Sequence, residues 1–227
     1  MPTLSSDFLR NPNYTKDHIL KESLAIGGHK RIFEYLLTRL ATADIVTSAE
    51  RLSLPLNDAG EAEVSFLGDT YLLSNDGVRR SDGQRVSYET GSALIHYILI
   101  ASCSRPAGQF VTFAELAGPL FKQGSYSRSA LELPITKRFQ GCVPELLSTA
   151  AAVGGRQGGV SGSGSISLVF DLLPHILIQI VFYDRDDEFP ARATLLFDHN
   201  ATQLIDFEAL AVLVGDRVCG ILDRDEL

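Results

Sequence analysis

Hydrophobic positions follow two different periods along this chain, and the change of period divides the sequence. Over residues 15–40 they fall near a 3.6-residue spacing, which predicts amphipathic helices interrupted at Gly27-Gly28. Over residues 63–88 short apolar runs are separated by turn sequences that end in Gly77 and Gly83, which predicts a meander of antiparallel strands whose last member is 84–88. The pattern predicts helices first and strands afterwards.

The rest of the chain continues with both periods. Helices are predicted over 91–103, over 136–153 and from Asp206 to about 222. Strands are predicted over 109–113, 165–170, 175–183 and 191–197. Irregular chain is predicted over 118–134 and over the glycine-rich segment 154–164. Asp206 is the expected N-cap of the last helix. Strands and helices in separate runs predict the α+β class, with a largely antiparallel sheet, an N-terminal helical segment and flanking helices. We expect an N-terminal arm and helices over 1–57 and an α+β domain over 58–227.

The net negative charge of the chain disfavours two classes of binding partner, nucleic acids and anionic membranes. The formal net charge is −8 and the isoelectric point is about 5.1, whereas a nucleic-acid binder needs a basic face. The same charge disfavours binding to an anionic membrane, and no apolar stretch is long and unbroken enough to span one. No signal peptide is expected, and three widely spaced cysteines suggest neither a disulfide framework nor a metal knuckle. We therefore expect a cytoplasmic protein with no nucleic-acid or membrane partner.

Two polar groups at strand ends are the candidates for chemistry. The first is the acidic run 184–188, in which Asp184, Asp186 and Glu188 share a face if the chain stays extended and so could hold Mg²⁺ or Ca²⁺. The second is Asp198-His199-Asn200, where a histidine beside a carboxylate could act as a general base or a metal ligand. Each has a structural alternative: the first as a solvated hairpin loop, the second as a turn.

Other motifs are weaker. His96 lies on a predicted helix and His175 follows a proline, and either histidine could be an interior residue. The glycine-rich segment lacks the Lys-Ser/Thr of a phosphate-binding loop, so a hairpin or crossover loop is the alternative to an anion site. No histidine pair has the spacing of a zinc site, and no metal is expected.

The C-terminal part resembles a known family. The resemblance is carried by four runs: Leu172-Leu173-Pro174, the strand 176–182, Asp187-Glu188-Phe189-Pro190-Ala191 and Leu196-Phe197-Asp198. They resemble an uncharacterised prokaryotic family, the domain of unknown function 3786, from about residue 61 to the C-terminus. Members often have a tryptophan before the acidic turn, and some carry a four-cysteine iron–sulfur segment at the N-terminus. This chain has neither feature. The resemblance implies a redox or one-carbon setting but no particular reaction.

These observations support three functional hypotheses. The first is an accessory protein that binds a small molecule or cofactor, with Asp186, Glu188, Asp198 and His199 as the binding residues. The second is a metal-dependent hydrolase that uses the same acidic turn and Asp-His strand end. The third is an interaction module that binds a partner protein through the N-terminal helices. Because a strand of about seven residues separates Glu188 from Asp198, we expect them at opposite ends of the sheet.

Overall fold

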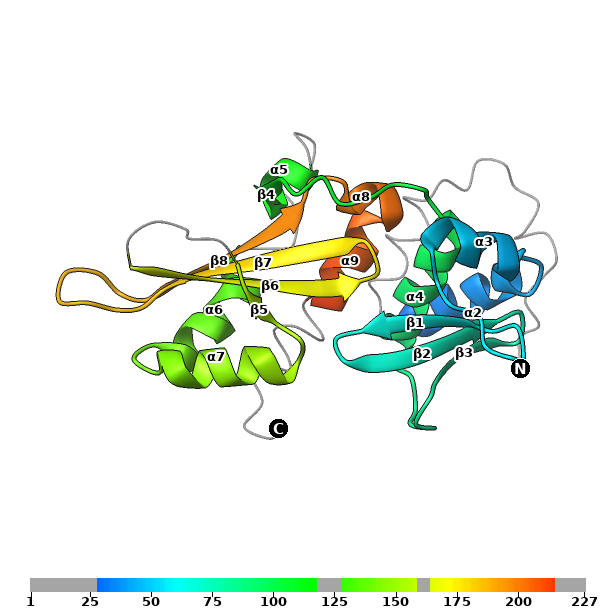
Figure 1. Ribbon diagram of the computed structural model, residues 1–227, viewed down its shortest axis with the longest axis horizontal. Coiled ribbons are helices and arrows are strands. Elements are labelled where there is room, and N and C mark those ends of the chain that lie inside the picture. The colour runs from blue at the N-terminus through cyan, green and yellow to red at the C-terminus, as the bar shows by residue number, and fades with distance from the viewer. Residues whose placement is uncertain (1–27, 118–127, 159–163, 215–227) are drawn as a thin grey trace.

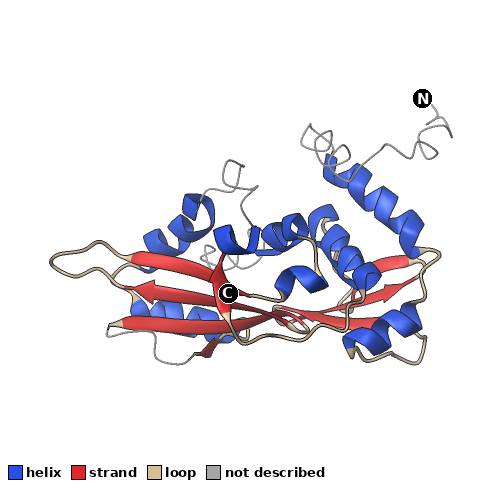
Figure 2. Cartoon of the chain, turned by 90° about the horizontal axis from the view of Figure 1, so that it is seen from above, coloured by secondary structure: helices blue, strands red, loops and turns tan. Residues whose placement is uncertain are grey.

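The chain forms two antiparallel sheets joined by helices (Figure 1). The computed structural model describes residues 28–117, 128–158 and 164–214. One sheet has the strand order β1-β2-β3 and the other the order β4-β8-β7-β6-β5. In the view of Figure 2 most helices lie on one side of the two sheets. The α+β class is confirmed, while the part of the predicted N-terminal helical stretch before residue 28 lies outside the described residues.

The three-stranded sheet is the predicted meander without its last strand. Its members are β1 (Ala62–Phe66), β2 (Asp69–Ser74) and β3 (Gly77–Arg80), paired in sequence order. The strand predicted over 84–88 is wrong, because Ser87 caps helix α4 (Tyr88–Ile100). The Ser87 hydroxyl accepts a hydrogen bond from the Thr90 N–H at 3.1 Å, which satisfies a free donor of the first turn. The helix therefore begins three residues before the predicted start.

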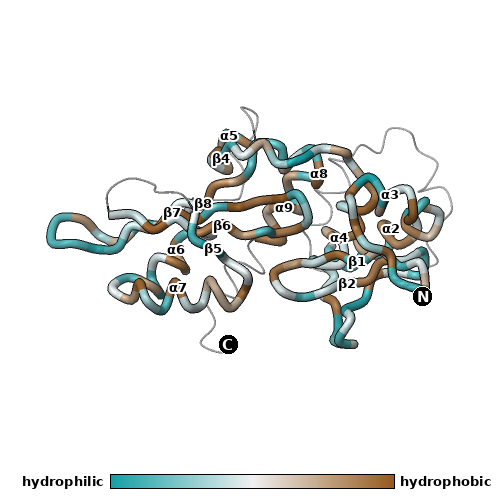
Figure 3. The backbone as a smooth tube through the Cα atoms, in the orientation of Figure 1, coloured by the Kyte–Doolittle hydropathy of each residue, from teal (hydrophilic) through white to brown (hydrophobic). Residues whose placement is uncertain are grey.

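The five-stranded sheet is built on two long hairpins. Its strands are β4 (Phe110–Thr112), β5 (Arg156–Gln157), β6 (Ser165–Leu173), β7 (Ile176–Tyr183) and β8 (Arg192–Asp198). In register, Leu168, Ile180 and Leu195 lie on one face, which belongs to the buried core. The opposite face carries a mixture of polar and apolar side chains. The two-residue period of β structure thus directs one fully apolar face inward. Figure 3 shows in brown the hydrophobic residues along these central strands.

Helix α4 lies at the centre of the molecule. It packs against α2 (Gly28–Leu40), α3 (Ile45–Leu52) and α9 (Phe207–Leu213), and it shares one continuous apolar core with both sheets. Tyr97 of α4 is fully buried, and its hydroxyl donates a hydrogen bond to the Pro174 carbonyl at 2.7 Å. Burial raises the pKa of Tyr97, so this phenol remains a neutral donor. The bond ties α4 to the turn between β6 and β7.

The segment predicted as irregular over 118–134 is partly helical. Helix α6 (Arg128–Phe139) includes Pro134, so the prediction is wrong for 128–134. The short helix α5 (Phe113–Ala117) begins in a capping box, in which the Thr112 hydroxyl accepts the Glu115 N–H and the Glu115 carboxylate accepts the Thr112 N–H. The hydrogen bonds from Thr112 lower the pKa of Glu115. Helix α7 (Val143–Ala152) begins with Pro144 in its first turn, as predicted.

The glycine-rich segment is more ordered than its composition predicts. Arg156 and Gln157 form β5, which pairs with β6, so the prediction of a flexible loop over 154–164 is wrong for these two residues. Gly155 precedes β5, and a β-carbon there would lie 2.5 Å from the Phe170 ring and 2.8 Å from the Ala150 carbonyl oxygen. Only a glycine lets α7 approach the sheet this closely.

Helix α6 also protects an edge of the sheet. Strand β4 pairs with only the last three residues of β8. Beyond it, the Leu195 N–H donates to Glu132 Oε1 at 3.0 Å and the Ala193 N–H donates to Thr136 Oγ1 at 3.1 Å. Side chains of α6 thus take the place of a neighbouring strand. They accept hydrogen bonds from backbone N–H groups that could otherwise pair with a strand of another molecule and cause aggregation.

The last helices follow β8 directly. Helix α8 (Ala201–Leu204) is one turn long, and α9 begins after Asp206. Asp206 stands at the N-cap position, as predicted, but its side chain makes no capping hydrogen bond. It lies instead 3.0 Å from His96 Nδ1, so it links α9 to α4. Across the described part of the chain, no helix has the length and apolarity to cross a membrane.

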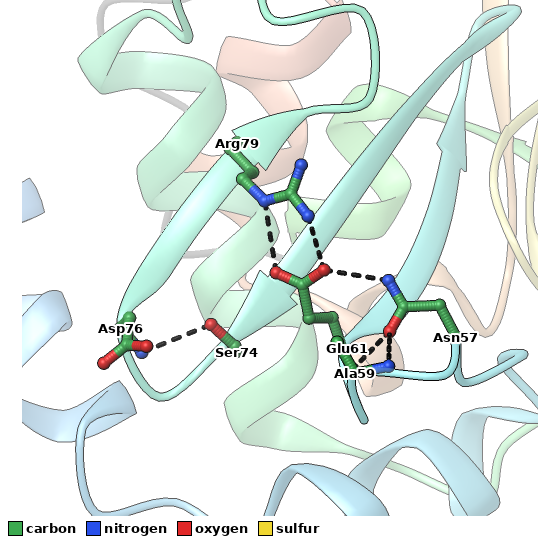
Figure 4. Close-up of polar contacts among 6 residues, drawn as sticks. All are labelled: Asn57, Ala59, Glu61, Ser74, Asp76 and Arg79. Atoms are coloured by element: carbon green, nitrogen blue, oxygen red, sulfur yellow. Dashed lines mark hydrogen bonds and ion pairs between the residues drawn. The ribbon is translucent and has the colours of Figure 1, made fainter.

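A polar network lies on the outer face of the three-stranded sheet (Figure 4). The Arg79 guanidinium donates to both carboxylate oxygens of Glu61, with 3.1 Å between Nε and Oε1. The Asn57 amide donates to the same carboxylate at 2.8 Å. The Arg79 hydrogen bonds, and then that of Asn57, hold the pKa of Glu61 below its ordinary value.

The edge protection of β8 predicts a stability effect. Thr136→Val leaves the Ala193 N–H without its acceptor, so we expect a loss of about 1–3 kcal/mol in the free energy of unfolding. Thr38→Val is the matched control, because Thr38 is an exposed helical threonine that bonds only the Tyr35 carbonyl. It should change stability by less than about 0.5 kcal/mol. Urea unfolding measures both, and equal losses would contradict the edge role.

The Glu61 network predicts a pH dependence. Because the folded pKa is depressed, its stabilisation is full above the unfolded pKa of about 4.3 and is lost as the pH falls through the folded value. Glu61→Gln should therefore lower the free energy of unfolding by about 0.5–1 kcal/mol at neutral pH, the scale of a partly exposed ion pair. The deficit should shrink below about pH 4. Glu63→Gln, two residues along in β1, is the control, and a pH-independent Glu61 deficit would refute the prediction.

Candidate functional site

The acidic run forms the loop between β7 and β8, residues 184–191, called here the β7–β8 loop. The Tyr183–Arg192 pair closes its base, and the loop projects from one end of the molecule in Figures 1 and 2. Asp186 Oδ1 accepts the N–H groups of Glu188 at 2.9 Å and Phe189 at 2.7 Å. The Asp186 N–H donates to the Phe189 carbonyl at 3.0 Å. The hairpin-loop interpretation is confirmed, and Asp186 acts as the turn residue.

The base of the loop is anchored to the helical corner between α6 and α7. Asp184 Oδ1 accepts the Gly141 N–H at 2.7 Å and the Arg185 N–H at 2.8 Å. The Arg185 guanidinium lies so close to Gly141 that a β-carbon there would be 3.2 Å from Nη2. Charged side chains at both points thus fix the path of the loop backbone.

At the tip, apolar surface is presented to solvent. Phe189 is 66% exposed, whereas the other exposed large hydrophobic side chains of the described residues range from 38% to 48%. Asp187 and Glu188 beside it are exposed as well. The loop therefore combines a projecting aromatic ring with carboxylates in solvent.

Asp198 has a structural environment at the opposite end of β8. Its carboxylate is completely buried. Oδ1 accepts the N–H groups of Ala107 and Asn200, both at 2.9 Å, and Oδ2 accepts the Gly108 N–H at 2.8 Å. These charge-assisted hydrogen bonds hold residues 101–109, called here the strap, which run from α4 to β4. The turn interpretation of Asp198 is confirmed.

The residues after Asp198 continue this attachment. The His199 N–H donates to the Gln109 carbonyl at 2.9 Å, and the His199 residue is exposed. The Asn200 amide donates to the Arg105 carbonyl at 2.9 Å. Sequence reasoning missed Arg105, whose guanidinium bonds Ser53 Oγ at 2.9 Å and thereby joins the strap to the end of α3. No local pattern around Arg105 signals that contact.

The four candidate residues do not form one site. Asp186 and Glu188 lie in the β7–β8 loop, whereas Asp198 and His199 follow β8 at the other end of the strand. The expected separation of Glu188 from Asp198 is confirmed. Within residues 28–117, 128–158 and 164–214, no group of three or more His, Cys, Asp or Glu side chains could hold a metal ion.

Two other histidines contact neighbouring elements. His175 has a left-handed backbone with φ of 67°, and its Nε2 lies 3.0 Å from the Leu52 carbonyl oxygen. His96 makes the contact with Asp206 described above. Both histidines therefore join separate elements of the fold.

The feature that sequence reasoning undervalued is Phe189. It was part of the family-like run 187–191 but not among the predicted binding residues. A phenylalanine between carboxylates and a proline, in a segment too polar to be buried, is the signal that could have identified it.

Fold and site together define an α+β domain with a buried carboxylate at one end of its main sheet and a projecting acidic loop at the other. The chain belongs to the family described as domain of unknown function (DUF3786), whose profile matches residues 44–218. This confirms the resemblance and extends it toward the N-terminus, through α3. No curated protein and no solved structure matches the chain.

The environments of Asp198 and Asp186 predict unequal losses of stability for the same aspartate-to-asparagine substitution. Asp198→Asn places an amide where three backbone donors converge, so we expect a loss of about 2 kcal/mol or more in the free energy of unfolding. Asp186→Asn keeps an acceptor for the turn at an exposed position and should cost less than about 0.5 kcal/mol. Chemical denaturation compares them, and a mild effect of Asp198→Asn would show that the strap does not depend on this carboxylate.

Proposed function

We propose that this chain is an accessory binding protein that docks through the β7–β8 loop onto a basic, partly apolar surface of another protein. The exposed ring of Phe189 carries the proposal. Burying a phenylalanine side chain contributes about 1.5–3 kcal/mol. An aromatic anchor that enters a pocket is a common energetic centre of protein interfaces.

The order within the loop supports docking. Asp186 holds the backbone of Glu188 and Phe189, and Asp184 holds the base of the loop against Gly141. A loop that is already fixed loses less conformational entropy when it binds. The turn residues thus serve the aromatic tip by pre-organising it.

The charge of the loop indicates the chemistry of the partner. Residues 184–188 contain four carboxylates and one guanidinium, which gives a net charge of −3. Such a segment attracts a basic surface and repels an acidic one. Because the charges are exposed, the attraction should weaken as salt is added.

A binding role also fits the arrangement of the candidate polar residues. Asp186 and Asp198 bond to backbone N–H groups of this chain, and the length of β8 separates them. That geometry supports neither a shared small-molecule pocket nor a joint hydrolytic site for Asp186, Glu188, Asp198 and His199. As part of the proposal we retain a cytoplasmic setting, supported by the free thiols of Cys103 and Cys142.

A photo-crosslinking amino acid in place of Phe189 tests the proposal in the cells that express the chain. We expect adducts from position 189 and none from position 46, where Val46 is also an exposed apolar residue. Asp187→Lys with Glu188→Lys, both exposed, should reduce the adduct yield about tenfold by reversing the charge beside the ring. Equal yields from positions 189 and 46, or yields unaffected by the charge reversal, would refute the proposal.

A further inference from the structure

We infer that the surface which receives the β7–β8 loop is helix α2 of a second copy of this chain. The inference rests on the proposed function, because it names the partner of the same loop. It begins from exposed side chains on α2: Arg31, Tyr35 and Arg39 are all exposed, and Tyr35 retains 39% of its accessible surface. Residues four apart on a helix are neighbours on one face, so the three form an Arg–Tyr–Arg stripe.

The stripe matches the loop in charge and in apolar character. Lys30 and Glu34 of the same helix pair at 3.7 Å and offset each other's charge, which leaves the two arginines of the stripe with a charge of +2. The loop has a net charge of −3 around an exposed phenylalanine. Phe189 stacked on Tyr35 would place Asp187 and Glu188 near a guanidinium about 6 Å along the helix on either side.

The position of the two surfaces requires a second molecule. The β7–β8 loop and α2 lie at opposite ends of the long axis in Figure 1, and Figure 2 shows the same separation. A loop therefore cannot reach α2 of its own chain. Contact between the two surfaces is head to tail. It leaves α2 unused in one copy and the loop unused in the other, so the chain of contacts can continue.

The size of the contact sets its strength. One loop against one helical face buries less than the roughly 1,200 Å² of a stable interface. We therefore expect a weak, salt-sensitive association, with a dissociation constant of about 10 μM to 1 mM.

Sedimentation velocity on the full chain tests the inference through complementary variants. The unchanged chain should show an average mass that rises with protein concentration and falls on addition of salt. Phe189→Ser removes the loop's anchor, and Arg31→Glu with Arg39→Glu reverses the stripe. Each variant alone should associate at least about tenfold more weakly, the effect of losing an interface hot spot. Val46→Ser, which changes an exposed apolar residue of α3, should associate like the unchanged chain.

The mixture of the two variants gives the decisive result. The Phe189→Ser protein keeps an intact stripe and the arginine-reversed protein keeps an intact loop, so together they should form a complex of one copy of each and nothing larger. A mixture that remains monomeric while the unchanged chain associates would overturn the head-to-tail contact. An unchanged chain that is monomeric at every concentration would overturn self-association, but adducts from position 189 with a different protein would then leave the proposed function standing. Absence of both would refute both.

Discussion

The buried carboxylate of Asp198 is the interaction on which the arrangement of this domain depends. It accepts three backbone N–H groups, two of them from the strap that leads from α4 to β4. Without that acceptor, Ala107 and Gly108 of the strap would each lose a hydrogen bond to a charged group, which contributes about 1.5–3 kcal/mol. Arg105 extends the attachment from the strap to Ser53 at the end of α3. One charged side chain at the end of β8 thereby connects the five-stranded sheet to the helices that support the smaller one.

The same strand sets the position of the projecting loop. Strand β8 pairs with β7 along almost its whole length, while β4 and side chains of α6 protect its other edge. A hairpin held in this way leaves its turn free of the core. Asp186 then orders the turn and directs Phe189 outward into solvent. The rigidity of the sheet is what makes an exposed aromatic residue usable as a docking element.

Much of the fold could be predicted from local patterns. The Asn75-Asp76-Gly77 turn and the apolar period of 165–197 gave the meander and the long strands, because turn chemistry and alternation act within a few residues. The helix over 128–134 was missed because Pro134 disfavours a helix interior. The strand predicted over 84–88 is wrong because the Ser87 side chain caps α4, and alternation of apolar residues carries no signal of a cap.

The candidate site was less accessible to sequence reasoning. The separation of Glu188 from Asp198 followed from the length of a strand, and the structure confirms it. Two of the three partners of Asp198, however, lie some ninety positions earlier in the sequence, and no local pattern identifies them. The exposure of Phe189 is likewise a property of the folded hairpin, because phenylalanine is usually buried wherever it stands in a sequence.

The central claim is that the β7–β8 loop is a pre-organised docking element. Hydrogen exchange of the full chain, measured at low and at high protein concentration, tests this claim most directly. The amides of Glu188 and Phe189 should already be protected at low concentration by the Asp186 carboxylate. At high concentration, added protection should appear in residues 184–191 and along α2, and not in the strap. Unprotected amides in the loop at low concentration, or concentration-dependent protection located elsewhere, would contradict it.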